Sequence, residues 1–161
     1  MSITMQTPEA VRSSVQSNVP DGARILIVCD EESDRKRLKL LLLDAGFDSE
    51  CVNSITTGCE AARSGQFQVV VSTPQLGDGS WRRLADIANH FDLHFEIVLW
   101  AHNFDLHEWS EALNHGAFDV VDAVFDRPRI AEVTKCALWA AYLRGARSNA
   151  KSIRPAQHQV A

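Results

Sequence analysis

Three short runs of consecutive apolar residues stand out along the chain, at residues 25–28, 69–71 and 97–100. Uninterrupted apolar runs of this length are typical of parallel β-strands that are buried on both faces. A weaker run at residues 47–52 predicts an edge strand, and residues 118–121 predict a fifth strand. The pattern therefore predicts a sheet with three strongly buried strands.

Between these strands, apolar residues recur at the spacing of a helix. Ser33 can cap a first helix that carries Leu38 and Leu42 on one side, and Gly46 can end it. Five strands alternating with five helices predict an α/β fold of three layers with a parallel sheet. The other four helices are expected at residues 54–64, 80–89, 104–115 and 128–143, with Gly116 ending the third of them and the last ending near Gly145.

Length and composition agree with one globular domain. The chain has 161 residues, of which 45% are hydrophobic and 23% charged, and this excludes a wholly disordered chain or a disulfide scaffold. We expect a flexible leader at residues 1–22, one folded domain at residues 23–146 and a basic polar tail at residues 147–161. No apolar run reaches the ~18–20 residues that span a bilayer, and the first residues lack a secretory signal. The expected location is the cytoplasm.

Charge is distributed unevenly along the chain. The net charge is −5, yet residues 128–161 carry one acidic residue against six lysines and arginines. The acidic body argues against a nucleic-acid-binding domain. A transcription regulator that binds DNA through the basic residues of 144–154 stays open as an alternative, which the lack of a following helix-turn-helix disfavours.

Cysteines and histidines give little support for metal or redox chemistry. The cysteines form no CxxC pair, so we expect reduced and mostly buried thiols. Five histidines lie close together in the sequence: His90, His94, His102, His107 and His115. His90 and His94 are spaced i, i+4 but lack a third ligand, which favours surface histidines over a metal site for all five. The segment Gly77–Ser80 lacks the lysine of a phosphate-binding loop, and we interpret it as a turn leading into a helix cap.

Four segments resemble those of response-regulator receiver domains: ILIVCDEESDRKRLKLLLLDAGF, FQVVVSTPQLGDGS, FEIVLWAH and ALNHGAFDVVDAVFDRP. They follow one another in the order of that family and cover nearly all of residues 24–146. The resemblance implies a (βα)5 flavodoxin-like receiver fold, with a parallel sheet in the strand order 2-1-3-4-5. It also implies a place in two-component signalling.

The phosphorylation chemistry of that family does not carry over. A receiver binds Mg²⁺ through two acidic residues after its first strand. It also uses an Asp after the third strand, a Ser or Thr after the fourth and a Lys after the fifth. In this chain the corresponding region is a degenerate phosphorylation pocket, formed by Cys29, Asp30, Glu31, Thr73, Trp100 and Ala123.

Each replacement removes a chemical group that phosphorylation requires. A threonine hydroxyl needs a general base before it attacks phosphorus, whereas a carboxylate is already anionic. Mg²⁺ prefers several hard oxygen ligands, so Asp30 alone should bind it weakly or not at all. We therefore predict a pseudo-receiver without a metal or other cofactor, in which Trp100 fills the crevice. Asp30 and Glu31 should also raise the pKa of the Cys29 thiol and leave it inert.

The last helix carries two apolar stripes. Ile130, Val133, Ala137 and Ala141 can face the sheet, whereas Cys136, Trp139 and Leu143 form a second stripe at i, i+3, i+7. In receivers this helix belongs to the usual dimer and output face, so the resemblance implies an interface at the second stripe, extended by Trp109 on the preceding helix. Packing on a neighbouring helix or under the leader is the alternative.

We interpret the chain as a receiver-like signalling domain that works independently of phosphorylation. It should not be an enzyme, and it should act by protein–protein interaction with an unidentified partner or as a homodimer, without membrane or nucleic-acid binding. A conventional phospho-accepting response regulator, a DNA-binding regulator and a small-ligand binder that uses the vacated pocket are the alternatives.

Overall fold

The computed structural model describes residues 22–160 of the chain and the side chains of residues 22–147. The expected leader, apart from its last residue, lies outside the described residues. Within the described part, no helix is both long and apolar enough to cross a membrane.

A five-stranded parallel sheet forms the centre of the molecule, in the order β2-β1-β3-β6-β7. Counted along this sheet alone, the order is the expected 2-1-3-4-5. Val28 at the end of β1 pairs with Ser72 of β3, which pairs with Leu99 of β6, so the carboxyl ends of the central strands lie at one edge. The strands are β1 (Ile25–Val28), β2 (Ser49–Val52), β3 (Val69–Ser72), β6 (Glu96–Ala101) and β7 (Asp119–Asp122).

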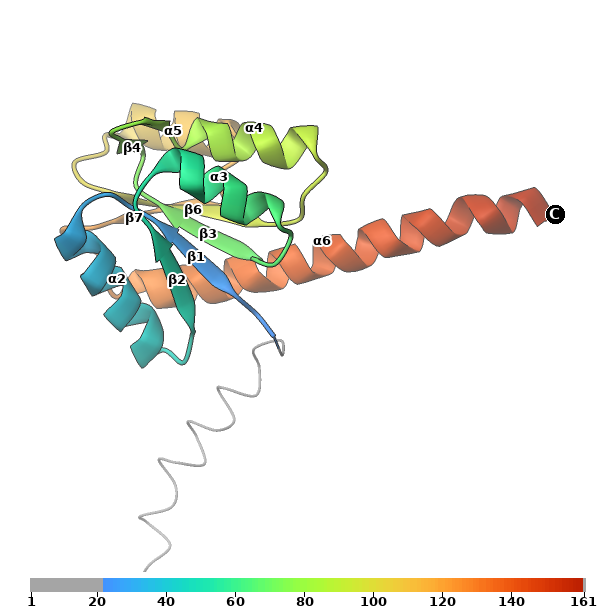
Figure 1. Cartoon of the computed structure of the whole chain (residues 1–161), viewed down its shortest axis with the longest axis horizontal. Helices are drawn as coiled ribbons and strands as arrows, with labels where there is room; N and C mark the ends of the chain where they lie inside the picture. Colours follow the sequence, from blue (N-terminus) through green and yellow to red (C-terminus); the bar gives the residue numbers. More distant parts are fainter. Residues whose placement is uncertain (1–21, 161) are drawn as a thin grey trace, which may run out of the picture.

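Helices cover both faces of the sheet (Figure 1). Helices α2 (Glu32–Asp44) and α6 (Arg129–Val160) lie on one face. Helices α3 (Ile55–Arg63), α4 (Arg82–His90) and α5 (Leu106–Asn114) lie on the other. Successive strand residues point to opposite faces, so each face has its own core cluster. A short hairpin of β4 (Gln75–Leu76) and β5 (Gly79–Ser80) follows β3.

Local signals explain most of the helix boundaries. Ser54 accepts a hydrogen bond from the Thr57 backbone and caps α3, as the sequence predicts. Gly46 and Gly116 follow α2 and α5 with φ of +90° and +109°, a conformation that favours glycine. The expected cap of α2 is wrong, because Glu31 rather than Ser33 occupies the N-cap position.

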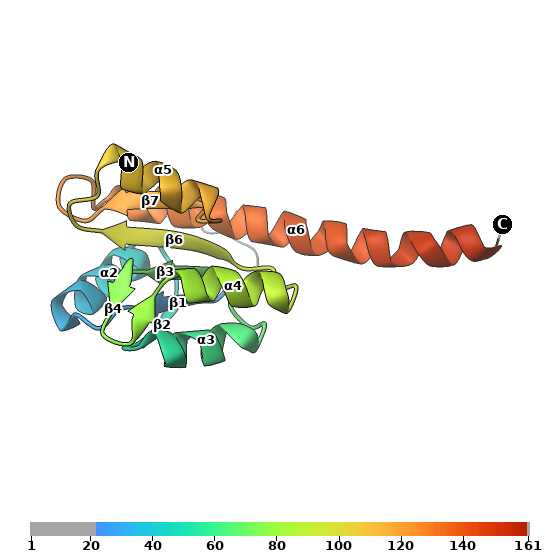
Figure 2. The same cartoon turned by 90° about the horizontal axis from the view of Figure 1, so that it is seen from above.

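The predicted end of the last helix is also wrong. Instead of stopping near Gly145, α6 continues to Val160 (Figure 2), so the expected polar tail is helical in its backbone. A glycine inside a helix costs only about 1 kcal/mol relative to alanine, and the alanines and arginines around Gly145 are strong helix formers. Without a glycine in the left-handed conformation, nothing at this position terminates the helix.

Candidate functional site

The expected pocket residues lie together along the carboxyl edge of the sheet. The backbone N–H of Thr73 donates to the Val28 carbonyl at 3.1 Å, and that of Ala123 donates to the Ala101 carbonyl at 2.9 Å, so the parallel ladders continue past the strand ends. Cys29, Trp100 and Ala123 belong to the same buried cluster on the face covered by α2 and α6. The structure therefore brings these side chains together.

Trp100 occupies the interior of this edge. Its side chain is fully buried, in agreement with the expected burial of the indole. The indole Nε1–H donates to Oδ1 of Asp34 at 3.3 Å. The Nε2 atom of His102 lies 3.2 and 3.0 Å from the two carboxylate oxygens of Asp34. One carboxylate from α2 thus holds two side chains from the end of β6, and we call these three residues the Trp100–Asp34–His102 group.

Sequence reasoning missed two members of this group. Asp34 is only 6% exposed, although it is an acidic residue in the first turn of a helix. A usable signal exists, since Asp34 lies four and eight residues before Leu38 and Leu42, which are both fully buried. His102 was interpreted as a surface histidine, and its half-exposed ring instead contacts a buried carboxylate.

The pKa of the Cys29 thiol is raised, as the sequence predicts. Burial is the main cause, and the carboxylates of Asp34 and Asp30 raise the pKa further, whereas the carboxylate of Glu31, which was expected to raise it, does not contribute. The thiol lies 3.5 Å from the Glu31 carbonyl. The buried hydroxyl of Thr73 makes no hydrogen bond within the described part of the chain. A thiol with a raised pKa is a poor nucleophile at neutral pH, and a threonine hydroxyl needs a general base before it can attack.

The residues present do not fit a magnesium site. Asp30 accepts a hydrogen bond from the Gly77 backbone N–H at 2.8 Å, and Glu31 is exposed at the start of α2. The carboxylate of Asp34 is already bonded to Trp100 and His102. Among residues 22–147, whose side chains the structure describes, no group of three or more His, Cys, Asp or Glu side chains is arranged to hold a metal ion.

Asp78 binds the backbone at the N-terminus of α3. Its carboxylate accepts hydrogen bonds from the Ile55 and Thr56 backbone N–H groups, at 2.8 and 2.9 Å, and from the Thr56 hydroxyl at 2.8 Å. The bonds from Thr56 and Ile55 lower the pKa of Asp78 to about 2. The segment Gly77–Ser80 is thus a turn that caps a helix, as expected, but that helix is α3 rather than the following α4.

The two stripes of α6 are separated as the sequence predicts. The first stripe is buried against the sheet, together with Leu138 and Thr134, which the pattern missed. Cys136 is exposed, and Trp139 and Leu143 of the second stripe are 38% and 55% exposed. The Trp139 ring packs edge to face against Tyr142, with 5.7 Å between the ring centres. The second stripe is therefore surface rather than core.

Trp109 lies on α5, beside the first residue of α6. It packs against the core cluster beneath α5, and the guanidinium of Arg129 is 5.9 Å from its ring centre. Arg129 begins α6, seven residues or two helical turns before Cys136. Whether Trp109 extends the interface stays a prediction.

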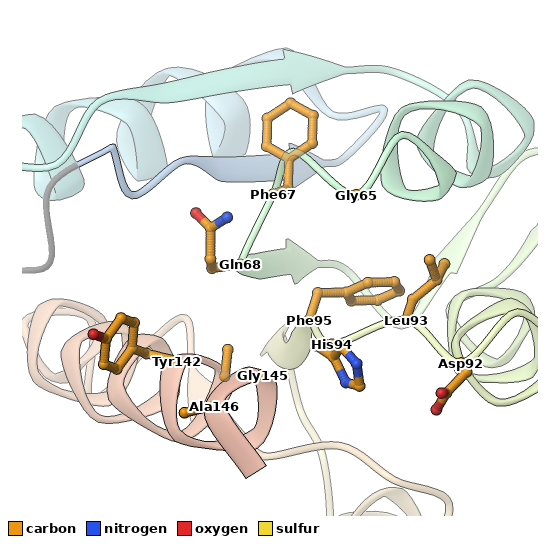
Figure 3. Close-up of a pocket in the computed structure, with 11 residues that line it drawn as sticks. Gly65, Phe67, Gln68, Asp92, Leu93, His94, Phe95, Tyr142, Gly145 and Ala146 are labelled. Atoms are coloured by element: carbon orange, nitrogen blue, oxygen red, sulfur yellow. The ribbon is translucent and has the colours of Figure 1, made fainter. Parts of the chain in front are cut away.

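A groove of about 440 Å³ lies at the opposite edge of the sheet (Figure 3). Phe67 and Phe95, near the starts of β3 and β6, line one side, and Tyr142 and Gly145 of α6 line the other. Beside it, the buried Glu96 forms an ion pair with Arg144. The groove lies where α6 leaves the sheet. None of the expected pocket residues lines it.

Comparisons with known proteins identify the architecture. No protein-family model matches the chain, and no curated protein matches it in sequence. Among solved structures, a signal receiver domain from Vibrio parahaemolyticus shares 18% identity with a TM-score of 0.70, over 77% of this chain and 95% of that one. A response regulator receiver domain from Clostridium thermocellum shares 21% identity with a TM-score of 0.66, over 75% and 98%.

A third structure agrees with these two. The signal receiver domain of an HD domain-containing protein from Pseudomonas fluorescens Pf-5 shares 20% identity with a TM-score of 0.65, over 74% of this chain and 97% of that one. The matched part spans nearly the whole length of each of these domains. The chain has the fold of a response-regulator receiver domain.

Proposed function

We propose that this chain is a phosphorylation-independent receiver-like signalling domain that works by binding a protein partner in a pathway of the two-component type. It performs no enzymatic step of its own. The observation that carries the proposal is the Trp100–Asp34–His102 group, which is packed into the edge where a receiver carries its phosphorylation chemistry.

The group has two consequences for phosphate chemistry. A fully buried indole takes up room at this edge, and its bond to Asp34 fixes its orientation. Asp34, the one carboxylate buried here, has both oxygens bonded to neighbouring side chains, so it is not free to attack phosphorus or to bind a metal ion. Ala123 offers no cation to a phosphoryl oxygen. These features support a site without phosphoryl transfer.

A domain without a phosphate switch needs a permanent surface for its work. The second stripe is the best candidate, because Trp139 is a large aromatic residue held edge to face against Tyr142 on an exposed helix face. Tryptophan is enriched among the residues that dominate binding energy at protein interfaces. The partner therefore contacts α6 rather than the carboxyl edge of the sheet.

Treatment with a small phosphodonor tests the proposal. The full chain is incubated with acetyl phosphate and Mg²⁺, and separately with beryllofluoride and Mg²⁺, and followed by intact mass and tryptophan fluorescence. We expect no added mass and no change in emission. Asp30→Asn and Asp78→Asn variants are treated in parallel. A Mg²⁺-dependent phosphate that one of these variants removes would establish a conventional phospho-accepting regulator instead.

A further inference from the structure

Helix α6 is longer than the sheet it covers. It contains 32 residues, which corresponds to a length of about 48 Å at 1.5 Å per residue. Both views show its C-terminal part projecting away from the rest of the molecule (Figures 1 and 2). Isolated helical segments are marginal in water unless an apolar face is buried, so the projecting part needs a partner.

The second stripe continues into this projecting part with the spacing of a coiled coil. Starting at Cys136, residues alternately three and four positions apart are apolar in seven cases out of eight. Such a 3-4 spacing corresponds to the a and d positions of a heptad repeat. We call these residues the seam: Cys136, Trp139, Leu143, Ala146, Ala150, Ile153, Gln157 and Val160.

The first four residues of the seam, whose side chains the structure describes, are exposed on the side of α6 that faces away from the sheet. The buried residues of α6 include Thr134, Ala137, Leu138 and Ala141, and in the same register these occupy positions f, b, c and f. Positions b, c and f lie on the side of a helix opposite a and d. The helix can therefore pack on its own sheet and on a second helix at the same time, with little competition between the two faces.

We propose that α6 pairs with α6 of a second copy of this chain as a parallel two-stranded coiled coil along the seam. Two identical seams are complementary to each other by symmetry. The inference rests on the proposed function only in using the second stripe as the interaction surface, and it names the partner of that surface.

The charges beside the seam favour the parallel direction. In a parallel pair each g residue faces the following e residue of the other helix, which places Tyr142 opposite Arg147 and Asn149 opposite Arg154. No two like charges meet. An antiparallel pair would instead bring e residues of the two helices together, including the two arginines. Pro155 lies near the end of the seam, and the helical hydrogen bond that it removes is the one to the carbonyl of residue 151, so residues 136–150 are unaffected.

Oligomeric state and cysteine cross-linking test the proposal. Sedimentation of the full chain should give twice the 17.9 kDa of one chain. Ile153→Glu in the seam should convert the dimer to a monomer. Ser152→Glu, next to it but outside the seam, should leave the dimer intact. Both substitutions lie in the projecting part, so the folded domain should keep its thermal midpoint in either variant.

Cys136 reports the direction and register. Mild oxidation should join Cys136 to the same residue of the second copy, and Cys136→Ser should abolish the bridge. In that serine background, Ala150→Cys in the seam should restore cross-linking, whereas Ser148→Cys at position f should not. A monomeric wild-type chain, a dimer that tolerates Ile153→Glu, or equal cross-linking at positions 148 and 150 would overturn the coiled coil. A monomer that does not react with phosphodonors would overturn the coiled coil and leave the proposed function standing. A coiled-coil dimer that accepts phosphate would support the coiled coil and overturn the proposed function.

Discussion

Replacing Trp100 by alanine tests whether the carboxyl edge of the sheet is packed as the structure indicates. The indole is completely buried in the cluster between the sheet and helices α2 and α6. Its Nε1–H is one of the donors to the carboxylate of Asp34, which is itself only 6% exposed. The substitution therefore opens a cavity and also removes a hydrogen bond from a buried anion.

Both effects lower the free energy of unfolding. Truncating a fully buried tryptophan to alanine costs about 3–5 kcal/mol when the surroundings relax only partly. Trp100→Phe removes the Nε1–H donor and keeps a smaller aromatic ring, so it leaves a smaller cavity than alanine does. Loss of the hydrogen bond to the charged carboxylate alone contributes about 1.5–3 kcal/mol. For a domain of this size, a loss of 3–5 kcal/mol corresponds to a fall in Tm of roughly 6–20 °C.

Urea denaturation and calorimetry measure these differences. We expect Trp100→Ala to lower the urea midpoint without changing the slope m, and Trp100→Phe to give an intermediate value. Trp139→Ala is the matched control, because the same truncation at a 38% exposed position should leave Tm nearly unchanged and weaken only association. If Trp100→Ala costs less than about 1 kcal/mol, the edge is not packed around the indole and the reasoning fails.

Three further substitutions test other parts of the structure. Hydrogen bonds from the N-terminus of α3 lower the pKa of Asp78 to about 2. The charged carboxylate therefore stabilises the folded state above about pH 4, and this contribution is lost as the pH falls toward 2. Asp78→Asn should flatten this part of the profile of Tm against pH. A Cβ on Gly58 would lie 2.9 Å from a methyl group of the fully buried Val28. Gly58→Ala should therefore lower the free energy of unfolding by about 1–2 kcal/mol. In a double-mutant cycle, adding Val28→Ala should recover part of that loss. Burial raises the pKa of Glu96, and the ion pair with Arg144 opposes this shift. Arg144→Met should therefore destabilise the protein by roughly 1 kcal/mol at pH 7 and by less near pH 4, where Glu96 is protonated. An equal loss at both pH values would contradict the role of the ion pair.

The strands could be predicted from the sequence because burial on both faces leaves a simple signal. Residues 97–100 are apolar without interruption and are all buried in β6, which lies inside the sheet. Edge strand β2 gives a weaker signal, since its four residues are half-buried or exposed. The edge position thus explains why its boundaries were the less well defined.

Glycine signals succeeded only where the backbone conformation requires glycine. Gly46 and Gly116 adopt positive φ after α2 and α5, and both helix ends were predicted from them. Gly145 lies within α6, where its small size is compatible with helical packing. A single sequence does not distinguish a glycine that terminates a helix from one that the helix merely tolerates.

The sequence predicted which strand-end residues lie at the carboxyl edge, but not the carboxylate that Trp100 contacts there. The positions of Cys29, Thr73, Trp100 and Ala123 follow from strand ends, which sequence patterns locate well. The bond between Trp100 and Asp34 joins residues 66 positions apart. No local spacing encodes such a contact, because it depends on how closely α2 packs against the end of β6. This is why an acidic residue at the start of a helix was not expected in the core.

The packing around Trp100 also bears on how such a domain could signal. A phospho-switch needs two arrangements of its pocket that differ by a few kcal/mol, so that a ligand can shift their populations. Trp100 shares one buried cluster with Ile130 and Leu138 of α6, and the Glu96–Arg144 ion pair holds α6 at the opposite edge of the sheet. These contacts tie α6 to the sheet at both of its edges. We therefore expect hydrogen exchange along residues 129–147 to be the same with and without a phosphodonor, so that the surface of α6 stays constant. Signalling through such a surface depends on which partner occupies it and at what concentration, and a phosphodonor-dependent change in exchange would show that the pocket still has a second state.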